Sequence, residues 1–262
     1  MTPTRDTASL PPHHKTPAPL TIFRSSLFLL WFAAMSVVVN IAALPSLVLP
    51  RAVIVWAARQ WCAATFWGLK FFAGLDFETR GEIPKGAVLV AAKHMSMWDT
   101  LALYLLLFDP VMVIKRELLA VPFYGWYVWK AGMIAIDRSA GASALRQMVE
   151  QARAVADEGR AVIIFPEGTR KNPGAPPDYK PGVAGLYAQL GIACVPVALN
   201  SGLYWTGPAG FLKKRGRIVI SFLPVIPAGL KRAAFMRALE ESTENATAAL
   251  VAEGRASLAS PA

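Results

Sequence analysis

The sequence predicts an α/β domain, with a mixed, largely parallel sheet flanked by helices, behind an N-terminal hydrophobic helical element that anchors it to a membrane. One observation predicts the α/β part: short apolar runs alternate with helix-like segments from Asp76 onward. A second observation predicts the anchor: the 26 positions from Ser25 to Pro50 contain no charged residue. That length can cross the roughly 30 Å hydrocarbon core of a bilayer as a helix.

Composition narrows the class of protein. Hydrophobic residues make up 55% of the chain and charged residues 17%, with a mean hydropathy of +0.40, which is more apolar than an ordinary soluble domain and indicates contact with lipid. The net charge of +10 predicts an anionic partner. Lipid head groups, a phosphorylated substrate and nucleic acid all fit, and the charge-free stretch favours lipid over nucleic acid. The two cysteines, Cys62 and Cys194, form no CxxC pair, so neither a disulfide nor a zinc site is expected.

Changes in composition divide the chain into four regions. These are a disordered tail (1–18), a membrane-anchoring helical hairpin or span plus an interfacial helix (19–75), the α/β domain (76–252) and a C-terminal tail (253–262). Asn40 and Pro45 interrupt the charge-free stretch, so its second half could kink or re-enter. Basic residues lie on both sides of the stretch, and a hairpin with both ends in the cytoplasm fits this symmetry better than a single span.

Within the α/β domain, short apolar runs predict strands at 87–92, 111–114, 133–136, 161–165, 192–199 and 217–222. Helical segments are predicted at 98–108, 142–157, 182–189 and 230–252.

Charged or polar residues follow five of the predicted strands. They are Lys93 and His94, Lys115 and Arg116, Asp137 and Arg138, Glu167, and Asn200. Ligands of open α/β sheets bind beyond the carboxyl ends of the strands. If the five strands are parallel, a histidine, two carboxylates and several cations therefore meet at one edge. The alternative is that these residues only begin surface loops.

The stretch "AAKHMSMWDT" contains the histidine that lies outside the N-terminal tail, His94, followed five positions later by Asp99. Residues five apart on one helix are rotated by about 140° and cannot meet. They can meet if His94 precedes a helix whose N-cap is Ser96, because "SMWD" has the form of a capping box. Asp99 then caps the helix and can also orient His94 as a general base. No GxSxG nucleophile occurs, so a substrate hydroxyl would attack directly.

Several motifs in order carry a resemblance to a known family. "KHMSMWD" is followed by residues 115–138, "FPEGTR" (165–170), "YKPG" (179–182) and "VPVALN" (195–200). Over residues 76 to 225 the chain resembles the glycerolipid acyltransferases, and most of all the bacterial enzymes that convert lysophosphatidate to phosphatidate.

The resemblance implies roles for individual residues. His94 would activate the sn-2 hydroxyl of 1-acylglycerol-3-phosphate, and Asp99 would orient it. Lys115 and Arg170 would bind the substrate phosphate, and Glu167 would support the His94 region or the glycerol. The other implied substrate-binding residues are Gly168, Thr169, Arg138 and Lys180.

The implied partners are lysophosphatidate, an acyl thioester (acyl-CoA or acyl carrier protein) and membrane lipid, with no nucleic acid. A thioester has a good leaving group, so no metal or cofactor is expected. The resemblance also implies the bacterial inner membrane, with the catalytic domain on its cytoplasmic face.

Two departures from the family pattern remain. Lys93 stands where asparagine is more usual, and we expect its side chain to point outward. "YKPG" makes the geometry of Lys180 uncertain. The basic cluster at 213–217 is expected to form a solvated hairpin tip. Alternative functions are acylation of another lysolipid, such as a lyso-ornithine lipid, and non-catalytic binding of anionic membrane lipid.

Overall fold

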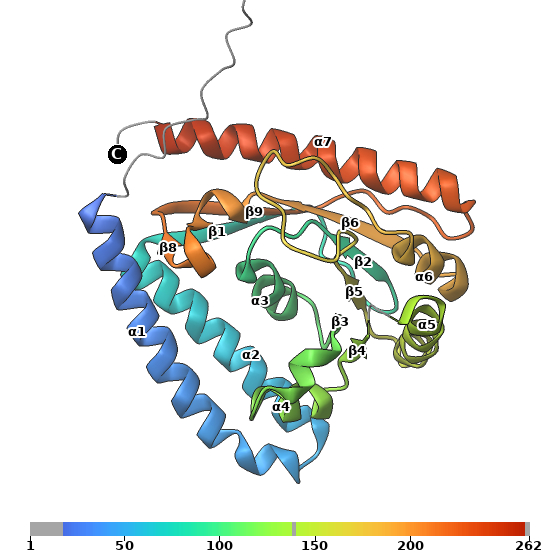
Figure 1. Ribbon diagram of the computed structural model, residues 1–262, viewed down its shortest axis with the longest axis horizontal. Coiled ribbons are helices and arrows are strands. Elements are labelled where there is room, and N and C mark those ends of the chain that lie inside the picture. The colour runs from blue at the N-terminus through green and yellow to red at the C-terminus, as the bar shows by residue number, and fades with distance from the viewer. Residues whose placement is uncertain (1–17, 138–139, 260–262) are drawn as a thin grey trace, which may run out of the picture.

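The computed structural model describes residues 18–137 and 140–259 (Figure 1). Residues 1–17 of the predicted tail and the candidate site residue Arg138 lie outside these ranges. A seven-stranded sheet has the order β1-β9-β6-β2-β5-β3-β4. Its strands are β1 (Leu75–Arg80), β2 (Leu89–Ala92), β3 (Val111–Lys115), β4 (Ile134–Ile136), β5 (Val162–Ile164), β6 (Cys194–Leu199) and β9 (Gly216–Phe222).

Five neighbouring strands of this sheet run in the same direction. Strands β2, β3, β4, β5 and β6 are parallel, whereas β9 is antiparallel to β6 and parallel to β1. The predicted mixed, largely parallel sheet is therefore confirmed. The carboxyl ends of the five parallel strands share one edge, so the described charged residues that directly follow these strands start from that edge.

Helices cover both faces of the sheet. The four residues of β2 are all buried, which is typical of a strand packed on both sides. Leu89 and Ala91 pack with α5 (Gly141–Asp157), α6 (Gly182–Leu190) and α7 (Arg232–Ala259). Val90 and Ala92 face the other way, toward α3 (Met97–Leu106) and the N-terminal helices.

The N-terminal helices form an antiparallel pair, visible at the left of Figure 1. Helix α1 (Pro19–Ala42) leads through a 3₁₀ turn at Leu44–Leu47 into α2 (Arg51–Gly68), which continues as a π-helical turn at Leu69–Ala73. The Trp31 indole N–H donates to Ala64 O at 3.2 Å. Gly68 permits this approach, because a Cβ there would lie 2.2 Å from Trp31 Cδ1. The two helices therefore form a hairpin, which is one of the arrangements expected for residues 19–75.

Four elements were not predicted from the sequence. Strand β1 is polar and only partly buried, so it lacks an apolar run. Helix α4 (Tyr124–Lys130) follows a 3₁₀ turn at Arg116–Ala120, and strands β7 (Trp205–Thr206) and β8 (Leu212–Lys213) form a separate two-stranded sheet. Helix α7 also continues to Ala259, beyond the predicted end at 252.

The basic cluster at 213–217 is only partly the solvated tip that we expected. Lys213 is buried, and its Nζ lies 4.2 Å from the centre of a Trp205 ring while donating to Gly210 O at 2.6 Å and Phe211 O at 3.0 Å. The prediction was wrong for this residue because its aliphatic stem and ammonium group fill a space between β8 and α1.

Candidate active site

His94 and Asp99 meet at the junction of β2 and α3. Strand β2 ends at Ala92, and α3 begins at Met97 with Ser96 as its N-cap. Both halves of the predicted capping box are present. The His94 Nδ1–H donates to Asp99 Oδ2 at 2.9 Å. The sequence-based geometry is therefore confirmed: the helix cap and the partner of the histidine are the same carboxylate.

Asp99 is completely buried and accepts several hydrogen bonds. The backbone N–H groups of Met95 and Ser96 donate to its Oδ2 at 2.6 and 2.9 Å. The Ser201 hydroxyl donates to its Oδ1. These donors hold both carboxylate oxygens in place, so the carboxylate can fix the orientation of His94. The role of Ser201 was not foreseen; the signal available was its position directly after Asn200 at the end of β6.

The His94 ring is held on a second side by Phe165. The two rings stack with centres 4.1 Å apart and planes inclined by 23°. Because Nδ1 donates to Asp99, the assigned tautomer leaves Nε2 without a proton and able to accept one. The side chain retains 12% exposure, so a small substrate group can reach it. The ring is therefore oriented as a general base requires.

Lys93 points into the protein, so the expectation that it points outward was wrong. It is 2% exposed, and its Nζ donates to Glu167 Oε1 at 2.9 Å and to Glu244 Oε1 at 2.8 Å. The Tyr179 hydroxyl donates to the same Glu244 oxygen at 2.9 Å. A buried ammonium group needs such partners. Lys93 therefore connects the His94 loop to the turn after β5 and to α7.

Glu167 lies beneath the site and does not line its open surface. Its side chain is 1% exposed, and its Oε2 is buried without a hydrogen-bond partner among the described residues. Burial raises the pKa of Glu167, and the nearby Lys93 ammonium opposes this rise. The geometry thus brings Glu167 to the His94 region, one of the two places suggested by the sequence.

The "EGTR" turn packs against the His94 loop. The Lys171 N–H donates to His94 O at 2.8 Å, and the Lys180 N–H donates to Pro166 O at 2.9 Å. Gly168 has a φ of 66°, a left-handed conformation that favours glycine. The next residues, Thr169 and Arg170, are exposed. The turn therefore presents its second half to solvent at the edge where His94 lies.

The predicted phosphate-binding cations surround this edge at different distances. Lys115 ends β3, and β5 lies between β3 and β2, so at about 4.8 Å per strand the two strand ends are roughly 10 Å apart. The side chains of Lys115 and Arg170 make no hydrogen bond or ion pair with another described residue. Lys180 pairs with Asp178 at 2.6 Å, and Lys171, which was not predicted, pairs with it at 3.3 Å.

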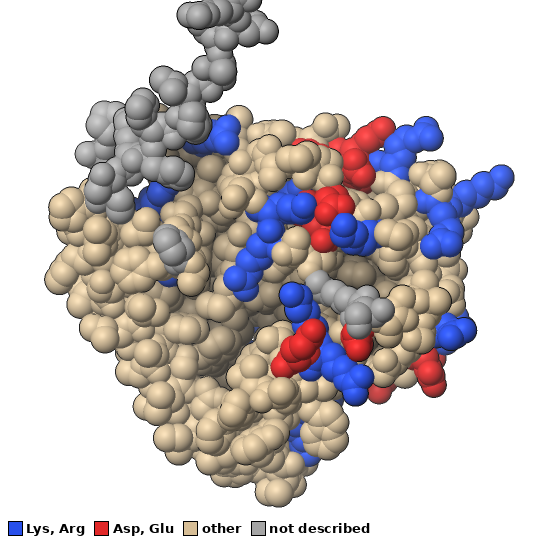
Figure 2. Space-filling view, in the orientation of Figure 1, with Lys and Arg blue, Asp and Glu red and all other residues tan. Residues whose placement is uncertain are grey.

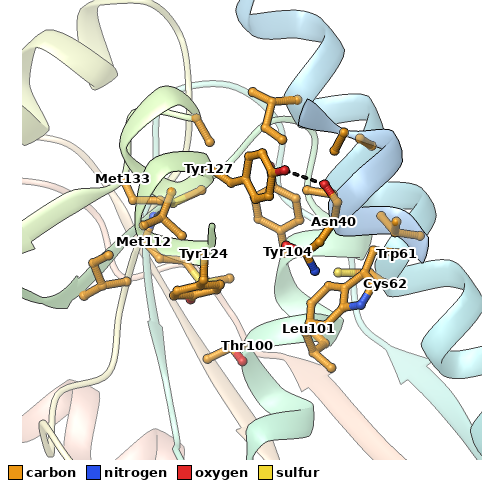
Figure 3. A pocket seen from close by; sticks show the side chains of 18 residues that line it. Asn40, Trp61, Cys62, Thr100, Leu101, Tyr104, Met112, Tyr124, Tyr127 and Met133 are labelled. Carbon is orange, nitrogen blue, oxygen red and sulfur yellow. Dashed lines mark hydrogen bonds between the residues drawn. The ribbon is translucent and has the colours of Figure 1, made fainter. Parts of the chain in front are cut away.

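An apolar pocket, drawn in Figure 3, adjoins the first turn of α3. Its walls come from α1, α2, α3, β3 and α4. Thr100 and Leu101, the two residues after Asp99, form part of the wall, together with Ala58, Trp61 and Met112. The few polar groups of the lining are mostly hydroxyls and the Asn40 amide. Such a lining suits a hydrocarbon chain.

Known proteins resemble this chain in sequence. The family model described as "Acyltransferase" matches residues 75–200. The 1-acyl-sn-glycerol-3-phosphate acyltransferase of Pseudomonas aeruginosa is 37% identical over 176 residues, which cover 66% of this chain and 68% of that protein. The lyso-ornithine lipid O-acyltransferase of the same organism is 33% identical over 139 residues, 52% of each chain.

A solved structure has the same fold. The crystal structure of the 1-acyl-sn-glycerophosphate (LPA) acyltransferase from Thermotoga maritima superposes with a TM-score of 0.71 at 20% sequence identity. The superposition covers 87% of this chain and 96% of that structure.

Proposed function

Because the chain belongs to the acyltransferase family, we propose that it transfers an acyl group from a thioester donor, acyl-CoA or acyl carrier protein, to the sn-2 hydroxyl of 1-acylglycerol-3-phosphate. The observation that carries this proposal is the His94–Asp99 pair at the strand edge, held as a base and its orienting carboxylate. The relative that acts on 1-acylglycerol-3-phosphate also matches this chain over a longer stretch than the relative named for lyso-ornithine lipid.

The proposed reaction begins at His94. Its Nε2 takes the proton of the sn-2 hydroxyl while the hydroxyl oxygen attacks the thioester carbonyl carbon. The tetrahedral intermediate collapses, the carbon–sulfur bond breaks, and the leaving thiolate receives the proton from the imidazolium. Asp99 holds the ring and stabilises its charged form during the transfer.

The cations at the edge fit a phosphate monoester, which carries about −1.5 to −2 charges near neutral pH. We assign Lys115 and Arg170 to this phosphate, because both side chains are exposed and have no hydrogen-bond or ion-pair partner among the described residues. Lys180 contributes from the same edge, and Arg138 stays a candidate outside the described ranges. Gly168 and Thr169 allow the backbone and a hydroxyl to approach the glycerol.

The apolar pocket is the proposed site of an acyl chain. It adjoins the first turn of α3, so a chain lying in it would extend away from the reacting groups near Asp99. Its apolar walls supply the burial that a hydrocarbon chain gains on leaving water, about 0.8 kcal/mol per CH₂ group.

The N-terminal hairpin is the proposed membrane anchor. Among the described helices, α1 alone is long and apolar enough to cross a bilayer by length and composition. Yet the Lys213 N–H donates to Ser25 Oγ at 2.9 Å, and Phe28 is buried in the core, so the domain packs along α1. A spanning α1 would draw the domain into the hydrocarbon. We therefore favour a hairpin embedded from one side, the cytoplasmic face of the bacterial inner membrane.

A thioester-release assay on detergent-solubilised protein tests the proposal. Lysophosphatidate should support release of free thiol, and His94→Ala should lower turnover by at least about 100-fold. Near-normal transfer by that variant would refute the base assignment. Arg170→Ala should raise the KM for lysophosphatidate without affecting acceptors that lack the phosphate. Faster turnover with lyso-ornithine lipid would overturn the head-group assignment, and lipid binding without thiol release would indicate a non-catalytic protein.

A further inference from the structure

Helix α4 and the loop before it expose an unusual set of aromatic side chains. Trp129 is 70% exposed and Trp126 is 50% exposed, and Phe123 and Val121 are also exposed. Large apolar side chains gathered on one surface cost free energy in water and mark a contact with another molecule or with lipid. We refer to Val121, Phe123, Trp126 and Trp129 as the α4 patch.

The outward direction of the α4 patch follows from how the helix is held. Gly125 is buried against the preceding turn, where a Cβ would lie 2.0 Å from Leu119 O. Trp126 and Trp129 are three positions apart and so share a side of the helix. The Phe123 ring contacts Trp126 with centres 5.2 Å apart, and Phe123 has a φ of 62°, which L side chains rarely adopt. The buried Gly125 and the left-handed backbone at Phe123 therefore keep these rings on the outer side of α4.

The α4 patch is continuous with the N-terminal hairpin. The Tyr127 hydroxyl donates to Asn40 O at the end of α1, and Ala131 shares an apolar cluster with Ala43 and Ile54. The turn between the two hairpin helices lies against α4, and its Val48 is 89% exposed. In Figure 2 most charged side chains gather over the right half of the face, whereas the hairpin at the lower left is largely uncharged.

Cations lie at the margin of the α4 patch. Arg116 and Trp129 line the same surface hollow, and Lys130 occupies the last turn of α4. Tryptophan beside lysine and arginine is typical of protein surfaces at the level of lipid head groups, where the ring meets acyl chains and the cation meets phosphates. An acidic protein partner would satisfy the cations but would leave the continuity with the apolar hairpin unexplained.

We propose that the α4 patch is a second membrane-contact surface, which seats on the leaflet that holds the hairpin. The proposal rests on the proposed function in taking membrane lipid as the partner. The opposite side of α4 lines the apolar pocket through Tyr127, Val128 and Ala131. With α4 seated on the leaflet, the pocket borders the acyl-chain region, and a lysolipid enters it without crossing water.

Photo-crosslinking tests the contact directly. The full chain would carry a photoreactive phenylalanine analogue at position 126 or 129, in vesicles of phosphatidylcholine and phosphatidylglycerol. The control position is the exposed Ala248 on α7, a helix that lies across the molecule from α4 in Figure 1. We expect lipid adducts at 126 and 129 and not at 248. Absence of lipid adducts at both positions, or adducts only to a second copy of the chain, would overturn the proposal.

A kinetic comparison tests its consequence. Trp126→Gln/Trp129→Gln should lose about tenfold or more of its turnover with long-chain lysophosphatidate in vesicles, equivalent to about 1.4 kcal/mol. It should keep its turnover with a short-chain, water-soluble acceptor. The exposed Val225→Gln is the control and should change neither rate. Equal losses with both acceptors would refute a membrane role. If the unmodified protein acylates no lysophosphatidate, the proposed function is wrong. The crosslinking result still shows whether the α4 patch contacts lipid.

Discussion

Replacing Lys93 with methionine should destabilise the protein strongly at neutral and alkaline pH. The change keeps the side-chain length but removes the ammonium group that pairs with Glu167 and Glu244 at 2.9 and 2.8 Å. At an effective dielectric constant of about 20, an ion pair at this distance is worth about 6 kcal/mol, before the cost of removing both charges from water. Removing one member of a buried pair costs about 3–5 kcal/mol, because the other charge stays buried alone.

The pH dependence of this loss has a definite sign. Burial already raises the pKa of Glu167 in the folded protein, and loss of Lys93 removes the group that opposes the rise. A carboxyl with a raised folded-state pKa binds more protons when folded than when unfolded. It favours folding below its unfolded pKa of about 4.3, and that contribution is lost as pH rises through the folded-state pKa. The variant should therefore be less destabilised at pH 5 than at pH 8.

Thermal unfolding in detergent measures this effect. At about 2–4 °C per kcal/mol, the melting temperature of Lys93→Met should fall by roughly 10 °C at pH 8. Lys93→Met/Glu167→Gln should recover much of the loss, because a buried pair can be replaced by neutral groups at little cost. Lys70→Met is the matched control, since Lys70 pairs with Asp76 at an exposed site and should change stability by less than about 1 kcal/mol. A Lys93→Met melting temperature within 2–3 °C of the unmodified protein at pH 8, or a pH-independent loss, would refute the reasoning.

Three further predictions follow from single side chains. Ser201→Ala removes a hydrogen bond to the Asp99 carboxylate, which is worth about 1.5–3 kcal/mol. The kcat should therefore fall roughly tenfold or more, with little change in KM. An unchanged kcat would count against the orienting role of Asp99. Ala58→Trp fills the pocket and should slow transfer of long acyl chains more than short ones, measured with donors of different length. Burial lowers the pKa of Lys213 to about 8, so the unfolded chain holds a proton there that the folded protein releases. Stability should therefore rise between pH 8 and 10.5, by on the order of 2 kcal/mol, and Lys213→Met should abolish the rise.

Local signals in the sequence predicted the central part of the site. The capping box places Asp99 near His94 through contacts within six residues, so the distance between them did not depend on the rest of the fold. The prediction that charged residues meet at one edge of the sheet required only that neighbouring strands be parallel. The alternation of strands and helices along the sequence predicts that arrangement.

The features that sequence reasoning missed depend on partners far along the chain. Lys93 points inward because Glu167 and Glu244 lie 74 and 151 positions away, and nothing near Lys93 in the sequence indicates them. Ser201 reaches Asp99 across 102 positions for the same reason. Helix α4 was missed because its seven residues are rich in aromatic side chains, which have modest helix propensity, and because its contacts with the hairpin come from residues far along the chain.

The attachment of Lys93 to α7 also means that the support of the His94 loop is completed late in synthesis. The hairpin and His94 are translated before α7, so under the proposed anchoring the hairpin can reach the bilayer while α7 is still being made. Ser201 and Glu244, which complete the support of Asp99 and Lys93, are translated much later. Until α7 has been released and docked on the sheet, Lys93 lacks one of its two carboxylate partners, and we expect acyl transfer to begin only after that step.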